Sequence, residues 1–250
     1  MAPQSTRRRL ARLLPCVASG SPASSSIERK LPPLGGALPA ELAAPLGDRL
    51  EALEAQLADH AEHPCYADVA VYTKAVQLAL KFGEFYAEGD DGALAVSALD
   101  VAEQRLGELQ QTAATGAQPS WCSAAGLVIR GYVSALDGSV QPYGLEVPAE
   151  AVASEAAAAP LWVWLHGRGD KNSDLASIMG WAERSAFPSA SFDTPPPPGV
   201  VVMHAFGRHC LGFKWAGEVD VLEATDHVCT QYSIDEDRCF IAHPYRTTAS

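Results

Sequence analysis

The chain has 250 residues, 48% of them hydrophobic, which suffices for one full domain or for a domain with a helical appendage. No apolar run approaches the roughly 20 residues that a membrane-spanning helix needs, so we expect no membrane span. The net charge of −12 is uneven: residues 1–30 carry six basic groups and one acid, a balance of +5, which leaves −17 for the remainder. This acidic body argues against nucleic-acid binding, which needs clustered positive charge.

Residues 1–44 are expected to form a basic tail and linker rich in Ser, Pro and Gly. Arg7, Arg8, Arg9 and Arg12 precede the first acid, a composition that suits a transit peptide for a mitochondrion or plastid. A disordered basic tail explains the same composition equally well. Prolines and glycines in 31–39 predict a linker after this tail.

Residues 45–120 are predicted to be helical. From Asp48 the leucines at 46, 50, 53 and 57 follow helical spacing, and acidic residues lie off that stripe. A second helix is expected over 66–86 and a third over about 93–111. No polar cluster points to a common centre, so we interpret these helices as packing elements.

The cysteines show no metal-binding spacing. They are scattered, without a Cys-x-x-Cys pair, which disfavours a zinc site, and we expect neither a metal nor a cofactor. Most are interpreted as small core residues. The six are Cys16, Cys65, Cys122, Cys210, Cys229 and Cys239.

Residues 121–242 alternate strand and helix patterns, which indicates an α/β sheet of about five strands. The runs 127–133 and 143–147 flank the turn dipeptide Asp137-Gly138 and predict an antiparallel pair. Wholly apolar runs predict buried strands at 161–165 and 199–203. A turn over 232–238 is expected to lead into a fifth strand at 239–242. Helices are expected at 173–187 and 218–231.

The run Leu161–Leu165 stops at His166-Gly167-Arg168-Gly169. Glycine has no Cβ, so the backbone after this strand can approach a ligand closely. In α/β-hydrolases such a loop supplies a backbone N–H to the oxyanion hole. His166, Gly167 and Arg168 are therefore candidate oxyanion-site residues; a glycine-rich turn without a ligand is the alternative.

Several motifs in order resemble those of prolyl-oligopeptidase-type α/β-hydrolases, near the esterase and depolymerase-like branch. The resemblance runs from about Tyr66 to Ala242 and implies acyl transfer on ester or peptide bonds through a Ser-Asp-His triad. It also implies the strand order 1-2-4-3-5-6-7-8. The motifs are Asp137–Leu145, Trp164–Asp170, Phe206–Arg208, Phe213–Asp220 and Ile234–Arg238.

The same resemblance places the nucleophile elbow, Gly-x-Ser-x-Gly, at 243–247. Tyr245 stands at the serine position, and His243 and Thr247 stand where the elbow needs glycines. Too few residues follow for the triad Asp and His. We therefore expect a truncated hydrolase-like domain at 121–242, a divergent tail at 243–250, and a serine hydrolase-like chain that is catalytically incomplete. A small ester or peptide would be its substrate if it were completed.

Other interpretations remain open. The chain could be a pseudoenzyme or binding module that uses the retained loop. Arg168-Gly169-Asp170 is an adhesion tripeptide, but its glycine already has a role in the hydrolase loop. A fifth strand left at the sheet edge would expose backbone groups, so a partner chain or chaperone is expected to cover it.

Overall fold

The computed structural model describes residues 34–86, 91–113, 115–153, 157–167, 173–182, 195–210 and 212–242. All belong to one compact unit, Pro32–Ser250. The predicted basic tail, Arg168 and Tyr245 lie outside the described residues, so their expected roles stay predictions.

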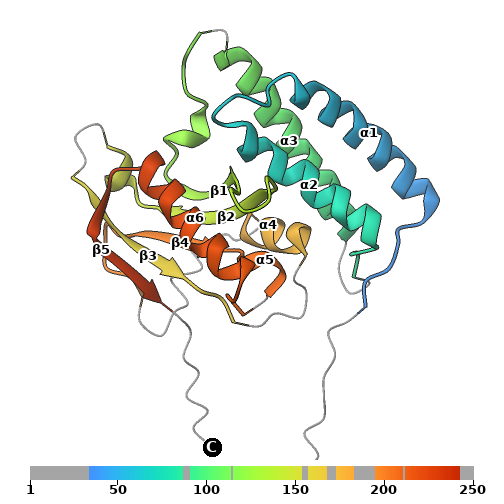
Figure 1. The fold of residues 1–250 in the computed structure, drawn as a ribbon. Coiled ribbons are helices and arrows are strands. Elements are labelled where there is room, and N and C mark those ends of the chain that lie inside the picture. The colour runs from blue at the N-terminus through green and yellow to red at the C-terminus, as the bar shows by residue number, and fades with distance from the viewer. Residues whose placement is uncertain are drawn as a thin grey trace, which may run out of the picture. The chain divides into compact units, whose positions relative to one another are not determined.

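Three long helices precede the sheet (Figure 1): α1 (Ala40–Ala58), α2 (Tyr66–Phe82) and α3 (Asp91–Ala113). The leucine stripe of α1 is buried, as its spacing predicts. However, α1 begins eight residues before Asp48, because the run Ala-Glu-Leu-Ala-Ala favours helix strongly and outweighs Pro45 inside it. No helix in the described ranges is long and apolar enough to cross a membrane.

Helix α2 is shorter than its pattern predicts. It ends at Phe82, because Gly83 adopts a left-handed conformation (φ 64°) and its N–H bonds back to the carbonyl of Ala79. Glycine reaches this conformation without steric cost, so it commonly terminates helices. The apolar periodicity that continues to Tyr86 is therefore not helical.

The five strands form one mixed sheet in the order β1-β2-β4-β3-β5. The first two strands and β2-β4 pair antiparallel, whereas β4-β3 and β3-β5 pair parallel. This confirms the predicted antiparallel pair, and the apolar strand β3 is parallel to both of its neighbours. The strands are β1 (Gly126–Val133), β2 (Val140–Val147), β3 (Ala159–Trp164), β4 (Val201–Ala205) and β5 (Ile234–Ala242).

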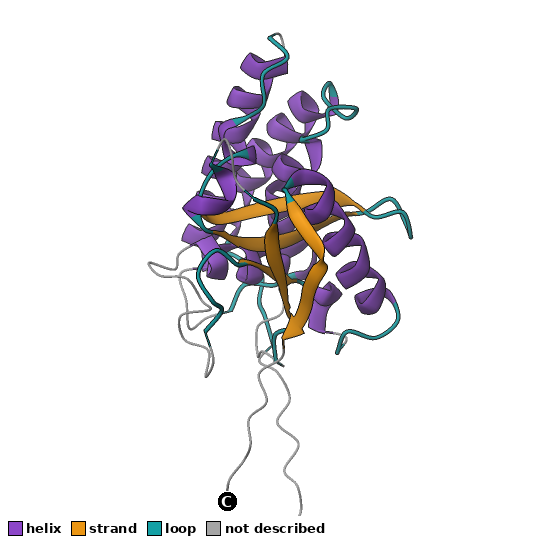
Figure 2. Cartoon of the chain, turned by 90° about the vertical axis from the view of Figure 1, so that its left-hand side faces the viewer, coloured by secondary structure: helices purple, strands orange, loops and turns teal. Residues whose placement is uncertain are grey.

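Helices lie on both sides of the sheet (Figure 2). On one face, Gly131 and Gly144 leave room for α2 and for Trp181 of α4 (Asp174–Ala182). Side chains alternate across a strand, so Tyr132 and Tyr143 point to the other face. There they contact α6 (Ala216–Gln231) through Asp220 and His227.

Strand β5 begins earlier than expected. Residues 234–238 of the predicted turn are part of this strand: Ile234 pairs with Ala159 and Cys239 with Leu161, and residues 235–238 form an irregularity between the two pairs. The polar run Asp-Glu-Asp-Arg is accommodated in this bulge, where Arg238 binds Asp235 at 2.5 Å. The start of β5 was not predicted because its residues are charged and lack the apolar pattern of a buried strand.

Candidate functional site

His166 joins the loops that follow β3 and β4. Its Nε2 lies 3.0 Å from the carbonyl oxygen of Phe206 and its Nδ1 lies 2.8 Å from that of Gly167. The ring also packs edge-on against Phe213, with centroids 5.1 Å apart. Because β3 and β4 are parallel, both loops lie at their carboxyl ends, where open α/β sheets bind ligands.

A neutral imidazole donates only one of the two hydrogen bonds, because it carries one ring proton. Both partners of His166 are backbone carbonyl oxygens. This side chain therefore holds the loop in place, and it is not placed as a general base for a hydroxyl nucleophile.

The backbone at Gly167 is open. The residue is exposed, and a Cβ built on it would meet no atom of the described residues within 4 Å. A ligand can therefore approach this peptide, as an oxyanion-site donor requires.

A strained segment follows β4 beside this loop. Arg208, Phe213 and Trp215 have positive φ angles of 49°, 51° and 52°. Such conformations cost on the order of 1–3 kcal/mol each in non-glycine residues and cluster at functional sites. The short helix α5 (Gly207–Cys210) lies within this segment. The sequence analysis did not predict that the strained segment belongs to a site, because backbone strain leaves no periodic signal in a sequence.

Buried polar contacts hold the strained segment. Asp220 accepts hydrogen bonds from the Tyr132 hydroxyl (2.7 Å) and from the N–H of Gly207 (2.8 Å). Desolvation raises the pKa of Asp220. Arg208 donates to Asp137 at 2.7 Å, and this hydrogen bond holds the pKa of Asp137 well below its usual range. The turn between β1 and β2 is thus tied to the loop after β4.

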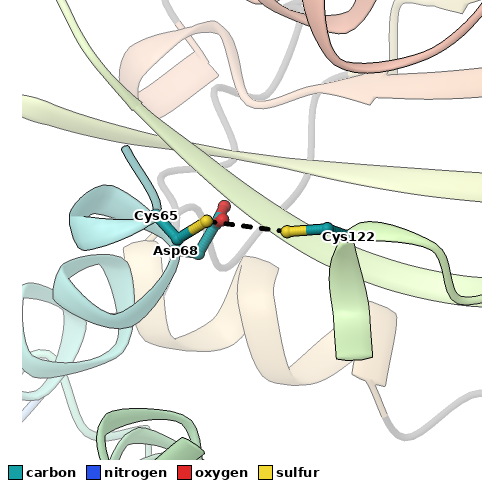
Figure 3. Close-up of side chains that lie close together, drawn as sticks. All are labelled: Cys65, Asp68 and Cys122. Carbon is teal, nitrogen blue, oxygen red and sulfur yellow. Dashed lines mark hydrogen bonds between the residues drawn. The ribbon is translucent and has the colours of Figure 1, made fainter. Parts of the chain in front are cut away.

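A second cluster lies at the start of α2, away from the sequence-predicted site. Cys65, Asp68 and Cys122 bring their ligand atoms within 4.8 Å of one another (Figure 3). The two sulfur atoms are 3.6 Å apart. The interpretation of most cysteines as small core residues missed this pair, because a separation of 57 positions gives no spacing signal.

This cluster is poorly suited to a metal ion. The Asp68 carboxylate already accepts hydrogen bonds from Arg130, Gly131 and Trp121. The Arg130 cation, 2.9 Å from Asp68, would oppose a second positive charge. A structural zinc site also needs four ligands, and this group offers three.

Two further histidines, one buried and one half-buried, bond to neighbouring side chains within the fold. His204, on β4, lies 2.6 Å from Glu146 on β2, and both side chains are buried. His227, on α6, lies 2.8 Å from the Tyr143 hydroxyl. The candidate site therefore consists of His166 and Gly167 after β3 together with the strained segment after β4.

In comparisons with known proteins, the chain matches no protein-family model and no curated protein sequence. The class that the structure defines is a mixed α/β fold with a five-stranded mixed sheet and flanking helices.

Proposed function

We propose that this chain is a serine hydrolase-like protein, in which residues 126–242 form the first five strands of an α/β-hydrolase sheet. Its reaction class is acyl transfer from an ester or peptide bond. The oxyanion of the tetrahedral intermediate would be bound by the backbone N–H of Gly167 or Arg168.

The observation that carries this proposal is the strand order. The sequence resemblance implies 1-2-4-3-5 for the first five strands, and the observed sheet has β1-β2-β4-β3-β5. This order places the loop after β3 next to the loop after β4. The contact between His166 and the Phe206 carbonyl is consistent with that placement.

The exposure of Gly167 supports the role of the loop. A backbone donor aimed at a developing oxyanion contributes about 2.7–4 kcal/mol to lowering the barrier. Such a donor has to be accessible to the substrate, and among the residues that the structure describes none would lie within 4 Å of a Cβ at Gly167. The strain at Arg208, Phe213 and Trp215 supports a functional role for the adjacent segment.

The polypeptide 1–250 is proposed to be inert as a hydrolase. The residues aligned with the elbow, 243–247, read His-Pro-Tyr-Arg-Thr and include no serine. Tyr245 is a poor substitute, because a phenol with an ordinary pKa near 10 needs an adjacent base to act as a nucleophile.

A segment exchange tests this proposal. Residues from 243 onward are replaced by the elbow and following half of an active prolyl-oligopeptidase-type esterase. We expect a fluorophosphonate probe to label the exchanged protein at the elbow serine, and to label neither the 1–250 chain nor an exchanged protein with that serine changed to alanine. A folded exchanged protein that stays unlabelled would refute the proposal.

An acyl-binding protein without turnover is the second candidate. The accessible Gly167 loop together with Tyr245 at the serine position favours it. This candidate predicts that the 1–250 chain binds a short-chain ester saturably and leaves it intact. Calorimetric titration combined with product analysis separates it from a hydrolase, which would consume the ester.

A further inference from the structure

Two thiols from distant parts of the sequence lie close together between the start of α2 and the turn before β1. Cys65 is the residue that precedes α2, and Cys122 ends the 3-10 helix η1 (Ser120–Cys122), four residues before β1. Figure 3 shows their side chains directed toward each other, with the sulfur atoms 3.6 Å apart. A disulfide bond holds its sulfur atoms about 2.05 Å apart, so the two sulfur atoms have to approach by roughly 1.5 Å to form one.

The two thiols differ in acidity and exposure. The hydrogen bond with Cys65 lowers the pKa of Cys122 against the effect of desolvation, and the charges of Arg130 and Arg105 also lower it. The same hydrogen bond raises the pKa of Cys65. Cys65 is buried and Cys122 is half-buried, so Cys122 is the thiol that a reagent from solvent meets first. The thiolate is the form that attacks a disulfide.

We propose that Cys65 and Cys122 form a reversible intramolecular disulfide that fastens the start of α2 to the turn before β1. The oxidant is a low-molecular-weight disulfide of the glutathione class. This inference does not depend on the proposed hydrolase function.

The exchange proceeds in two steps. The Cys122 thiolate attacks one sulfur of the small disulfide, forms a mixed disulfide and expels one small thiolate. Deprotonated Cys65 then attacks the Cys122 sulfur, forms the protein disulfide and expels the second small thiolate. Two protein thiols are oxidised by two electrons, one small disulfide is reduced to two thiols, and the two protein protons end on those thiols.

The bond would close a loop that contains α2 and α3. The two cysteines are 57 positions apart in the sequence. A cross-link over such a loop restricts the unfolded chain and so stabilises the folded protein. The neighbouring Asp68 already ties α2 to β1 through Arg130 and Gly131. The disulfide would add a covalent tie at the same junction.

A second thiol pair requires the test to identify which cysteines react. Cys229 and Cys239 also interact, since each influences the pKa of the other. Trypsin separates the two pairs. Cys65 falls in peptide 50–74 and Cys122 in 106–130, whereas Cys229 falls in 215–238 and Cys239 in 239–246.

The experiment equilibrates the folded 1–250 protein with mixtures of reduced and oxidised glutathione, quenches the thiols, and maps tryptic peptides without reduction. We expect peptide 50–74 joined to 106–130, with the loss of two hydrogen masses. Cys122→Ser should abolish this species, and the control Cys239→Ser should retain it. The proposal would be overturned if the linked peptides were absent from the folded wild-type protein at every glutathione ratio, or if they appeared only after denaturation.

Thermal unfolding provides the second readout. In the Cys229→Ser/Cys239→Ser background, oxidation should raise Tm by about 5–15 °C. The same treatment should leave Tm unchanged when Cys122→Ser is added. An equal rise in both proteins, or no rise in either, would contradict a fastening role for this pair.

Discussion

At the residue scale, Asp68 connects three elements. Its carboxylate accepts from Arg130 Nε at 2.9 Å, from the N–H of Gly131 at 2.8 Å and from Trp121 Nε1 at 3.0 Å. The side chains of Asp68 and Arg130 are each 1% exposed. These partners lie 53 to 63 residues away in sequence, so no local pattern could have predicted them.

We expect Asp68→Asn to destabilise the fold by about 3–5 kcal/mol, because it leaves the Arg130 cation buried without a counter-charge. The matched control is Asp100→Asn, which breaks the exposed pair with Arg49 and should cost less than about 1 kcal/mol. Denaturant unfolding at constant m-value measures both. Equal, small losses would show that Arg130 is compensated in another way.

His227 should make stability depend on pH. Desolvation lowers its pKa in the folded state, so the unfolded chain binds a proton more readily as pH falls through about 6.5. Stability should therefore decrease from pH 7 to pH 5. The variant His227→Gln can still bond to Tyr143 but cannot take up a proton. Its free energy of unfolding should therefore fall less steeply with decreasing pH, by a slope that corresponds to at most about one proton taken up on unfolding. The measurement is urea unfolding of both proteins at several pH values. The same dependence of the unfolding free energy on pH in both would contradict the assignment.

At the element scale, the contact between α2 and β1 depends on one glycine. A Cβ at Gly131 would lie 2.3 Å from the Ala67 carbonyl oxygen and 2.6 Å from Val71 Cγ1. The helix and the strand therefore approach more closely than any larger residue allows. The sequence predicted both elements, but not this contact, since a glycine inside a strand pattern has several explanations.

Gly131→Ala should destabilise the protein by about 3 kcal/mol through overpacking against backbone. Gly107, inside α3, has nothing within 4 Å of an ideal Cβ, so Gly107→Ala should instead stabilise by about 0.5–1 kcal/mol. Chemical denaturation of the two variants gives the comparison. A neutral Gly131→Ala would mean that α2 does not pack on β1 as closely as described.

Element types were more predictable than their limits. Apolar periodicity located the leucine face of α1 and the buried strands, because burial selects those residues directly. It misplaced the end of α2 and the start of β5, where a left-handed glycine and a polar bulge decide the boundary. The contact between His166 and Phe206 needed the strand order, which periodicity does not contain.

At the scale of the whole molecule, β5 is the outer strand of the described sheet. Phe240 and Ile241 are 54% and 71% exposed, and as neighbours on a strand they face opposite sides. An exposed, apolar edge strand is a template for pairing with another chain. We propose that a partner chain, a chaperone or a second copy covers this edge.

The purified chain should therefore self-associate, and Phe240→Lys/Ile241→Lys should reduce that association, because charged residues protect sheet edges. Trp215→Lys is the matched control: it removes an apolar side chain that is 79% exposed but lies off the edge strand, and association should persist. Sedimentation velocity measures the effect. A monodisperse wild-type monomer would contradict the proposal.

The central claim is that the peptide groups after β3 bind the oxyanion. The most direct measurement is kcat for ester hydrolysis in the segment-exchanged protein, comparing proline with alanine at Gly167 and at Arg168. Proline removes the N–H and alanine keeps it. We predict that one proline variant loses about 10²–10³-fold in kcat relative to its alanine counterpart. Proline and alanine variants that agree within about threefold at both positions, in folded protein, would contradict the claim.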